Sequence, residues 1–153
     1  MHAQAASICL HRHGYSTGVE LLIHGDFSDK VRVQWVHEIE EAILRYWNDQ
    51  VEAVEQGAVG LALLITRLVT GYTVVERSVL GTGIDWWLGS TDDPLFQRKA
   101  RLEVSGIMSG STAQVDARAR IKIEQTRRSD DTGLEAYIVV VEFSAPQAQV
   151  VKR

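Results

Sequence analysis

The segment Ala136–Phe143, with the sequence AYIVVVEF, constrains the fold more than any other part of this chain. Its almost continuous run of apolar and β-branched residues predicts a strand that is buried on both faces of a sheet. A helix is predicted just before it, over Thr112–Arg128, with Ser111 or Thr112 as its N-cap. A buried strand that follows a helix indicates parallel pairing, because parallel neighbours need a crossover connection. We therefore expect an α/β protein with a mixed sheet.

Three further strands are predicted before this crossover helix, each rich in β-branched or aromatic residues. They are YTVVERS at 72–78, IDWWL at 84–88 and KARLEVSGI at 99–107. An apolar helix over Ala58–Val69 precedes them, and the glycines at 57 and 60 either break a longer helix or allow it to pack closely on a neighbour. From residue 56 to 145 the predicted order is therefore helix, three strands, helix and strand.

The first part of the chain has weaker patterns. Residues 1–18 are expected to form a loosely ordered terminus, with or without a short edge strand, and Val19–His24 is expected to be a strand. Ser28 or Asp29 can cap a following helix. A second short strand around residues 31–33 is the alternative, because β-branched and charged residues alternate there.

A long amphipathic helix is expected over residues 35–54, where apolar residues recur at spacings of three and four. It would precede the core of the fold. Because this helix is rich in Trp and Tyr, it is the candidate surface for a homodimer or another protein partner. Residues 144–153 are expected to be a polar tail.

The composition is that of one ordinary globular domain over residues 1–153, with 45% hydrophobic and 24% charged residues. A formal net charge of −4 argues against a protein held to nucleic acid by bulk charge, although it leaves room for a local basic groove. The single cysteine, Cys9, allows neither an intramolecular disulfide nor a cysteine zinc site. No export signal is recognised, and the apolar stretch 58–69 is interrupted by Thr66 and Arg67, so we expect a cytoplasmic protein without a membrane span.

Two acids occupy unusual positions in this pattern. Asp85 and Glu103 each lie inside a predicted strand between apolar neighbours. Side chains alternate along a strand, so Glu103 shares one face with Arg101 and Ser105. A buried acid costs free energy unless it is paired, and two acids on neighbouring strands repel each other. A divalent cation is one good reason to bring them together.

Each acid also has a simpler explanation that involves no ligand. Asp85 can be a carboxylate at the end of a turn, paired with a backbone N–H group or an arginine. Glu103 can form a salt bridge within the sheet, with Arg77, Arg98 or Arg101 as its partner.

Over residues 52–145 the chain resembles the PD-(D/E)xK nuclease-like superfamily. That family has an αβββαβ core, the order predicted here, in a restriction-endonuclease-like mixed sheet. Its strand-borne acid, followed by an E-x-K tripeptide on the next strand, is similar to Asp85 followed by Glu103-Val104-Ser105. The GTGID segment at 81–85 is similar to the glycine-rich approach to the acid in many members.

The resemblance implies Mg²⁺-dependent hydrolysis of phosphodiesters in DNA or RNA. It implies that Asp85 and Glu103 hold the metal, which would activate water and neutralise charge that develops on the phosphate. It also suggests an auxiliary acid on the preceding helix, for which Glu55 and Glu52 are the candidates. Polar residues of the crossover helix can complete such a site. The candidates there are Lys122 and Gln125.

One position departs from the family pattern. Ser105 stands where the family has its lysine, and serine carries no positive charge to orient water or stabilise the transition state. Lys122, Arg101 or Lys99 could supply that charge from nearby positions. The alternative is a non-catalytic subunit or adaptor on the same fold, in which Asp85 and Glu103 are locked in salt bridges. Glu55 and the basic residues of the helix would then be solvated surface groups.

Overall fold

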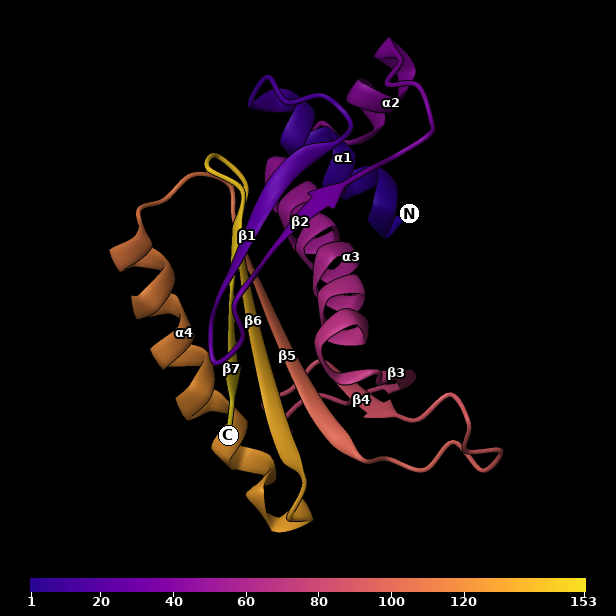
Figure 1. Cartoon of the computed structure of the whole chain (residues 1–153), viewed down its shortest axis with the longest axis vertical. Helices are drawn as coiled ribbons and strands as arrows, with labels where there is room; N and C mark the ends of the chain where they lie inside the picture. Colours follow the sequence, from indigo (N-terminus) through magenta and orange to yellow (C-terminus); the bar gives the residue numbers. More distant parts are fainter.

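The computed structural model describes all 153 residues and contains a seven-stranded mixed sheet with helices on both sides (Figure 1). The strands lie in the order β2-β1-β7-β6-β5-β4-β3. The helices are α1 (His2–Arg12), α2 (Glu41–Tyr46), α3 (Gln50–Thr70) and α4 (Thr112–Thr126), and a 3₁₀ helix, η1 (Arg127–Thr132), continues α4. The strands are β1 (Val19–Gly25), β2 (Asp29–Val33), β3 (Thr73–Arg77), β4 (Trp86–Gly89), β5 (Ala100–Ile107), β6 (Glu135–Glu142) and β7 (Gln147–Lys152).

The centre of the sheet is formed by β5 and β6, which pair in parallel from Ala100 opposite Glu135 to Ile107 opposite Glu142. Helix α4 connects them, and it begins at the predicted N-cap Ser111, which forms a capping box with Gln114. Every residue of β6 after Glu135 is buried. The predicted buried strand, its parallel pairing and the crossover helix are therefore confirmed.

Helix α3 covers the opposite face of the sheet from α4, together with α1 (Figure 1). A Cβ atom added at Gly57 would lie 3.0 Å from the Ala6 backbone, so glycine allows α1 and α3 to approach closely. The close-packing interpretation of the two helix glycines is thus the correct one. By length and mean hydropathy α3 could span a membrane. One side of this helix, which includes Ala53, Ala58 and Leu61, is buried in the core of the fold.

The prediction of a loosely ordered terminus is wrong. Residues 2–12 form α1, and Ala5, Ile8, Cys9 and Leu10 are completely buried. The histidines and glycines of this segment suggested disorder, whereas its apolar residues find their burial on α3. That partner surface is distant in the sequence, so local patterning underestimates the helix.

The long helix predicted over residues 35–54 is also wrong. This range contains the short helix α2 and the first residues of α3, which is a separate helix that begins at Gln50 with Asp49 as its N-cap. The Asp49 carboxylate accepts hydrogen bonds from the backbone N–H groups of Val51 and Glu52. This cap creates a second helix start inside a run whose apolar spacing is continuous. Just upstream, the strand alternative is correct, because β2 pairs antiparallel with β1.

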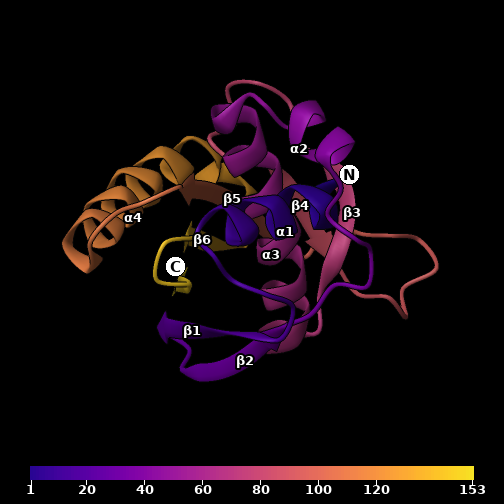
Figure 2. The same ribbon diagram turned by 90° about the horizontal axis from the view of Figure 1, so that it is seen from above.

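The predicted polar tail is instead β7, which lies inside the sheet. It pairs antiparallel with β6 and parallel with β1, and its Ala148 and Val150 are buried. Glutamines at 147 and 149 make this segment polar by composition, although the alternation is that of a strand. Through β7 the β1–β2 hairpin joins the sheet at the end opposite β3 (Figure 2).

Candidate functional site

A cleft lies where strand β5 extends beyond its neighbour β4. The β4–β5 ladder ends with Trp86 opposite Leu102, so the following residues of β5 pair only with β6. A cleft of about 880 Å³ occupies this edge. Its walls come from α3, α4 and the end of β5, with further residues from α1, β3 and the start of β4. The polar and charged side chains of its lining are His2, Gln50, Glu55, Gln56, Arg77, Asp85, Ser105, Arg118 and Lys122.

The structure brings Asp85 and Glu103 together. Asp85 directly precedes β4 and does not lie within a strand as predicted. Because the last ladder pair is Trp86 with Leu102, Asp85 and Glu103 are the next residues along the two strands. The Asp85 Oδ2 atom accepts a 2.9 Å hydrogen bond from the Val104 backbone N–H group. The turn-end explanation of Asp85 is therefore correct for one of its oxygens.

Glu103 is buried, with 1% of its surface exposed, and its two carboxylate oxygens differ in their surroundings. Oε1 accepts hydrogen bonds from Lys122 Nζ at 2.7 Å and Gln125 Nε2 at 3.0 Å. Oε2 is buried without a hydrogen-bond partner. Glu103 thus forms a salt bridge, but with the crossover helix and not with the sheet arginines considered from the sequence. One buried acceptor remains free for another group.

Burial raises the pKa of Glu103 to about 7, and the charge of the neighbouring Asp85 raises it further. The hydrogen bond from Lys122 and its charge act in the opposite direction. A single lysine is therefore not enough to keep Glu103 fully ionised at neutral pH. A proton or a cation bound by the carboxylates of Asp85 and Glu103 would neutralise their remaining negative charge.

A glycine in the turn before β4 allows this arrangement. Gly83 has φ +71°, and a Cβ atom there would overlap with the backbone carbonyl of Gln125. The GTG turn can therefore press against the end of α4, which brings Asp85 next to the residues that contact Glu103. A turn is present at residues 81–83, but the sequence does not reveal what it contacts.

Ser105 and Arg118 form a second polar contact beside the acids. Ser105 Oγ accepts a 2.8 Å hydrogen bond from Arg118 Nη1. Arg118 is one of the basic residues of the crossover helix, for which a solvated face or a phosphate-binding groove is expected from the sequence, and it is not among the predicted site residues, although its spacing is a signal. Arg118, Lys122 and Gln125 are spaced four and three residues apart, so they share one face of α4. That face covers the side of β5 that carries Glu103 and Ser105.

The other predicted residues take more peripheral positions. Glu55 lines the cleft from α3 but is exposed and contacts neither acid. Glu52 is exposed outside the cleft, and Lys99 is exposed before β5 begins. Arg101 cannot supply charge to the cleft, because it is bound elsewhere.

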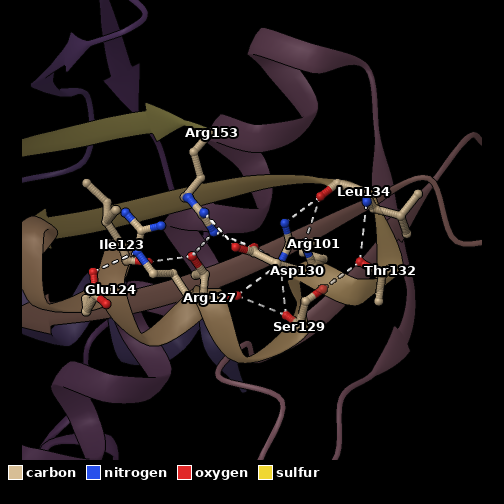
Figure 3. Close-up of polar contacts among 10 residues, drawn as sticks. Arg101, Ile123, Glu124, Arg127, Ser129, Asp130, Thr132, Leu134 and Arg153 are labelled. Carbon is tan, nitrogen blue, oxygen red and sulfur yellow. Dashed lines mark hydrogen bonds and ion pairs between the residues drawn. The ribbon is translucent and has the colours of Figure 1, made fainter.

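Arg101 is buried beneath the end of α4, in the cluster drawn in Figure 3. Its guanidinium group donates to the backbone carbonyls of Leu134 and Thr126 and to Ser129, and it pairs with Asp130 at 3.1 Å. Arg153 also pairs with Asp130, at 2.7 Å. Hydrogen bonds and positive charge, mainly from Arg153 and also from Arg101, hold the pKa of Asp130 well below its usual range. This cluster fixes the end of the helix that carries Lys122 and Gln125.

The candidate metal ligands are thus two carboxylates, and no group of three or more His, Cys, Asp or Glu side chains is arranged to hold a metal ion. No protein-family model matches this chain, and no curated protein or solved structure matches it either. What the site does must therefore be inferred from its own residues.

Proposed function

We propose that this protein is a divalent-metal-dependent phosphodiesterase that acts on nucleic acid, built on a restriction-endonuclease-like core. The observation that carries the proposal is the meeting of Asp85 and Glu103 at the open edge of β5, with a buried Glu103 oxygen that has no partner. Adjacent acids repel each other, and a cation between Glu103 and Asp85, which lines the cleft, would relieve that repulsion.

The order of elements supports the same proposal. Helix α3, strands β3, β4 and β5, helix α4 and strand β6 follow one another as in the PD-(D/E)xK superfamily that the sequence resembles. Strands β3, β4 and β5 are antiparallel neighbours, and β5 is parallel to β6. In this frame Asp85 comes from the turn that leads into β4, Glu103 comes from the adjacent strand β5, and Lys122 comes from the crossover helix.

The donor set fits a small divalent cation. Mg²⁺ is usually held by one or two protein carboxylates and keeps several waters, so two acids are sufficient for it. Asp85 and Glu103 would hold the ion, which when bound would polarise the phosphate and activate water. Gln125 and Lys122 orient Glu103 through Oε1 and leave Oε2 free. Lys122 and Arg118 place positive charge in the cleft, where Ser105 has none.

Incubation with DNA and RNA, each single-stranded and double-stranded, in Mg²⁺ or Mn²⁺ tests the proposal. We expect cleavage by the wild-type chain and its loss in Asp85→Asn and Glu103→Gln. Glu52→Gln is the matched control, because Glu52 is an exposed acid outside the cleft, and this variant should cleave normally. Absence of cleavage on every substrate, together with absence of cation binding by calorimetry, would contradict the proposal.

A second candidate function is a non-catalytic adaptor on the same fold. The salt bridge between Lys122 and Glu103 favours it, since a structural role already explains one oxygen of that acid. The partner surface proposed for residues 35–54 would then be a discontinuous one, with Tyr46 of α2 and Val51 of α3 among its exposed residues. Light scattering on the purified protein tests for a homodimer. Pull-down with the wild-type protein and with Tyr46→Ala, compared side by side, tests for another protein partner.

A further inference from the structure

The charge of the cleft differs from that of the whole chain. The formal net charge of the protein is −4, yet three cationic side chains line the cleft against two acidic ones. Lys122 is occupied by Glu103. Arg77 and Arg118 have no carboxylate within ion-pair distance. Two arginines without an anionic partner in one cleft point to an anionic ligand.

Arg118 is held in place while most of its donors stay free. A guanidinium group has five N–H donors, and the Ser105 hydroxyl accepts from one of its nitrogens. The remaining donors can contact a phosphate in the bidentate way that favours arginine. Ser105 lies two residues beyond Glu103 on the same face of β5, and Arg118 lies one turn before Lys122 on α4. Arg118 is therefore offset from the acid pair by about 6 Å along the helix.

Arg77 lies on the other side of the acid pair. It comes from β3, where it is opposite Trp86, the residue that follows Asp85. Its guanidinium carbon lies 5.5 Å from the centre of the Trp86 ring. Since β4 lies between β3 and β5, Arg77 and Arg118 come from elements on opposite sides of the β4 strand that Asp85 precedes.

The cleft also contains polar ring atoms that suit a nucleobase. Trp86 Nε1 and His2 Nδ1 are both buried without hydrogen-bond partners, and the two rings meet edge to face with centroids 6.5 Å apart. Such groups can bond the polar edge of a base only when that edge is not already paired. Bases are available in this way in single strands and not within a duplex.

From these contacts we propose that the cleft binds a single-stranded polynucleotide, with Arg118 and Arg77 each holding a phosphate on one side of the acid pair. Ser105 is the positioning residue for Arg118. This inference rests on the proposed function, since it names the substrate class of the same site. It requires no cleavage, however, so binding and catalysis can be measured apart.

Fluorescence anisotropy of labelled 12-nucleotide single-stranded DNA, single-stranded RNA and duplex DNA, all in EDTA, tests the proposal. We expect wild-type protein to prefer one or both single strands over the duplex. Arg118→Ala and Arg77→Ala should each weaken binding about tenfold and reduce the salt dependence by about one counterion. Arg120→Ala removes a charge from the exposed surface of the same helix outside the cleft and should change affinity less than about twofold.

Ser105 has a more specific signature. Ser105→Ala should weaken binding by about threefold, Ser105→Thr should restore it, and the melting temperature should stay unchanged in both variants. Equal losses in Arg118→Ala and Arg120→Ala, tighter binding of duplex, or no binding at all would overturn the inference. Binding that depends on Arg118 without any cleavage in Mg²⁺ would instead overturn the proposed function alone. Cleavage by the wild-type protein, together with unchanged binding in Arg118→Ala, would overturn this inference and leave the proposed function standing.

Discussion

Two clusters of charged residues lie on the same face of β5 beneath α4, and they are completed in different ways. The Arg101 cluster, with Asp130 and Arg153, satisfies its buried arginine through protein groups alone (Figure 3). The Glu103 cluster leaves a buried carboxylate oxygen and the neighbouring Arg118 without ionic partners. Two residues along one strand thus separate a closed structural network from an open one. An open network at a cleft is where a ligand completes the bonding.

The largest expected effect concerns the closed cluster. Arg101→Met should lower the free energy of unfolding by about 3–5 kcal/mol, because it leaves buried carbonyl groups and a hydroxyl without their donor. Urea denaturation measures this change. Arg98→Met is the control, since Arg98 forms a half-exposed salt bridge with Glu76 and should contribute less than about 1 kcal/mol. Similar losses in the two variants would contradict the structural role assigned to the buried Arg101 network.

The two clusters should respond to pH with opposite signs. The pKa of Glu103 is raised to about 7 from 4.5, so the folded chain holds more protons than the unfolded chain between these values. Stability should therefore fall as pH rises from about 5 to 7, by about 2 kcal/mol for one such group. The pKa of Asp130 is lowered, so its contribution is present above 3.8 and is lost as pH falls below that value.

Unfolding curves at several pH values check both signs. Glu103→Gln should flatten the profile between about pH 5 and 7 without altering the acid limb, and Asp130→Asn should do the opposite. A Glu103→Gln profile that keeps the wild-type slope near neutrality would show that another group titrates there.

A divalent cation should stabilise the open cluster by a smaller amount. At ten times its Kd, an ion that binds only the folded chain raises the free energy of unfolding by about 1.4 kcal/mol. Thermal unfolding with and without Mg²⁺ or Mn²⁺ measures the shift. Asp85→Asn and Glu103→Gln should abolish it, and Glu52→Gln should retain it. Equal shifts in all four proteins would place the cation away from these acids.

The smallest expected effect concerns Glu55. Because it is exposed at the cleft wall and contacts neither acid, Glu55→Gln should change the proposed cleavage rate less than about threefold, or about 0.6 kcal/mol. Single-turnover kinetics at saturating Mg²⁺ give the comparison with Glu103→Gln. A loss of more than a hundredfold would instead make Glu55 part of the metal site, as the sequence resemblance implies.

Elements whose signals are local can be predicted from the sequence. The buried run of β6, the capping box of α4 and the three strands before it follow from periodicity and from residues that act on near neighbours. The sequence also pointed to Asp85 and Glu103, since acids between apolar strand residues stand out in any register.

Elements whose burial depends on distant partners become evident only in the folded chain. Helix α1 is buried because the glycines of α3 admit it, and β7 is a strand because β1 and β6 lie on either side of it. The site follows the same rule. Nothing local pairs Lys122 with one oxygen of Glu103, leaves the other oxygen free or brings Arg118 to Ser105. Those contacts arise when α4 folds back over β5, because a side chain's partners depend on which surfaces meet.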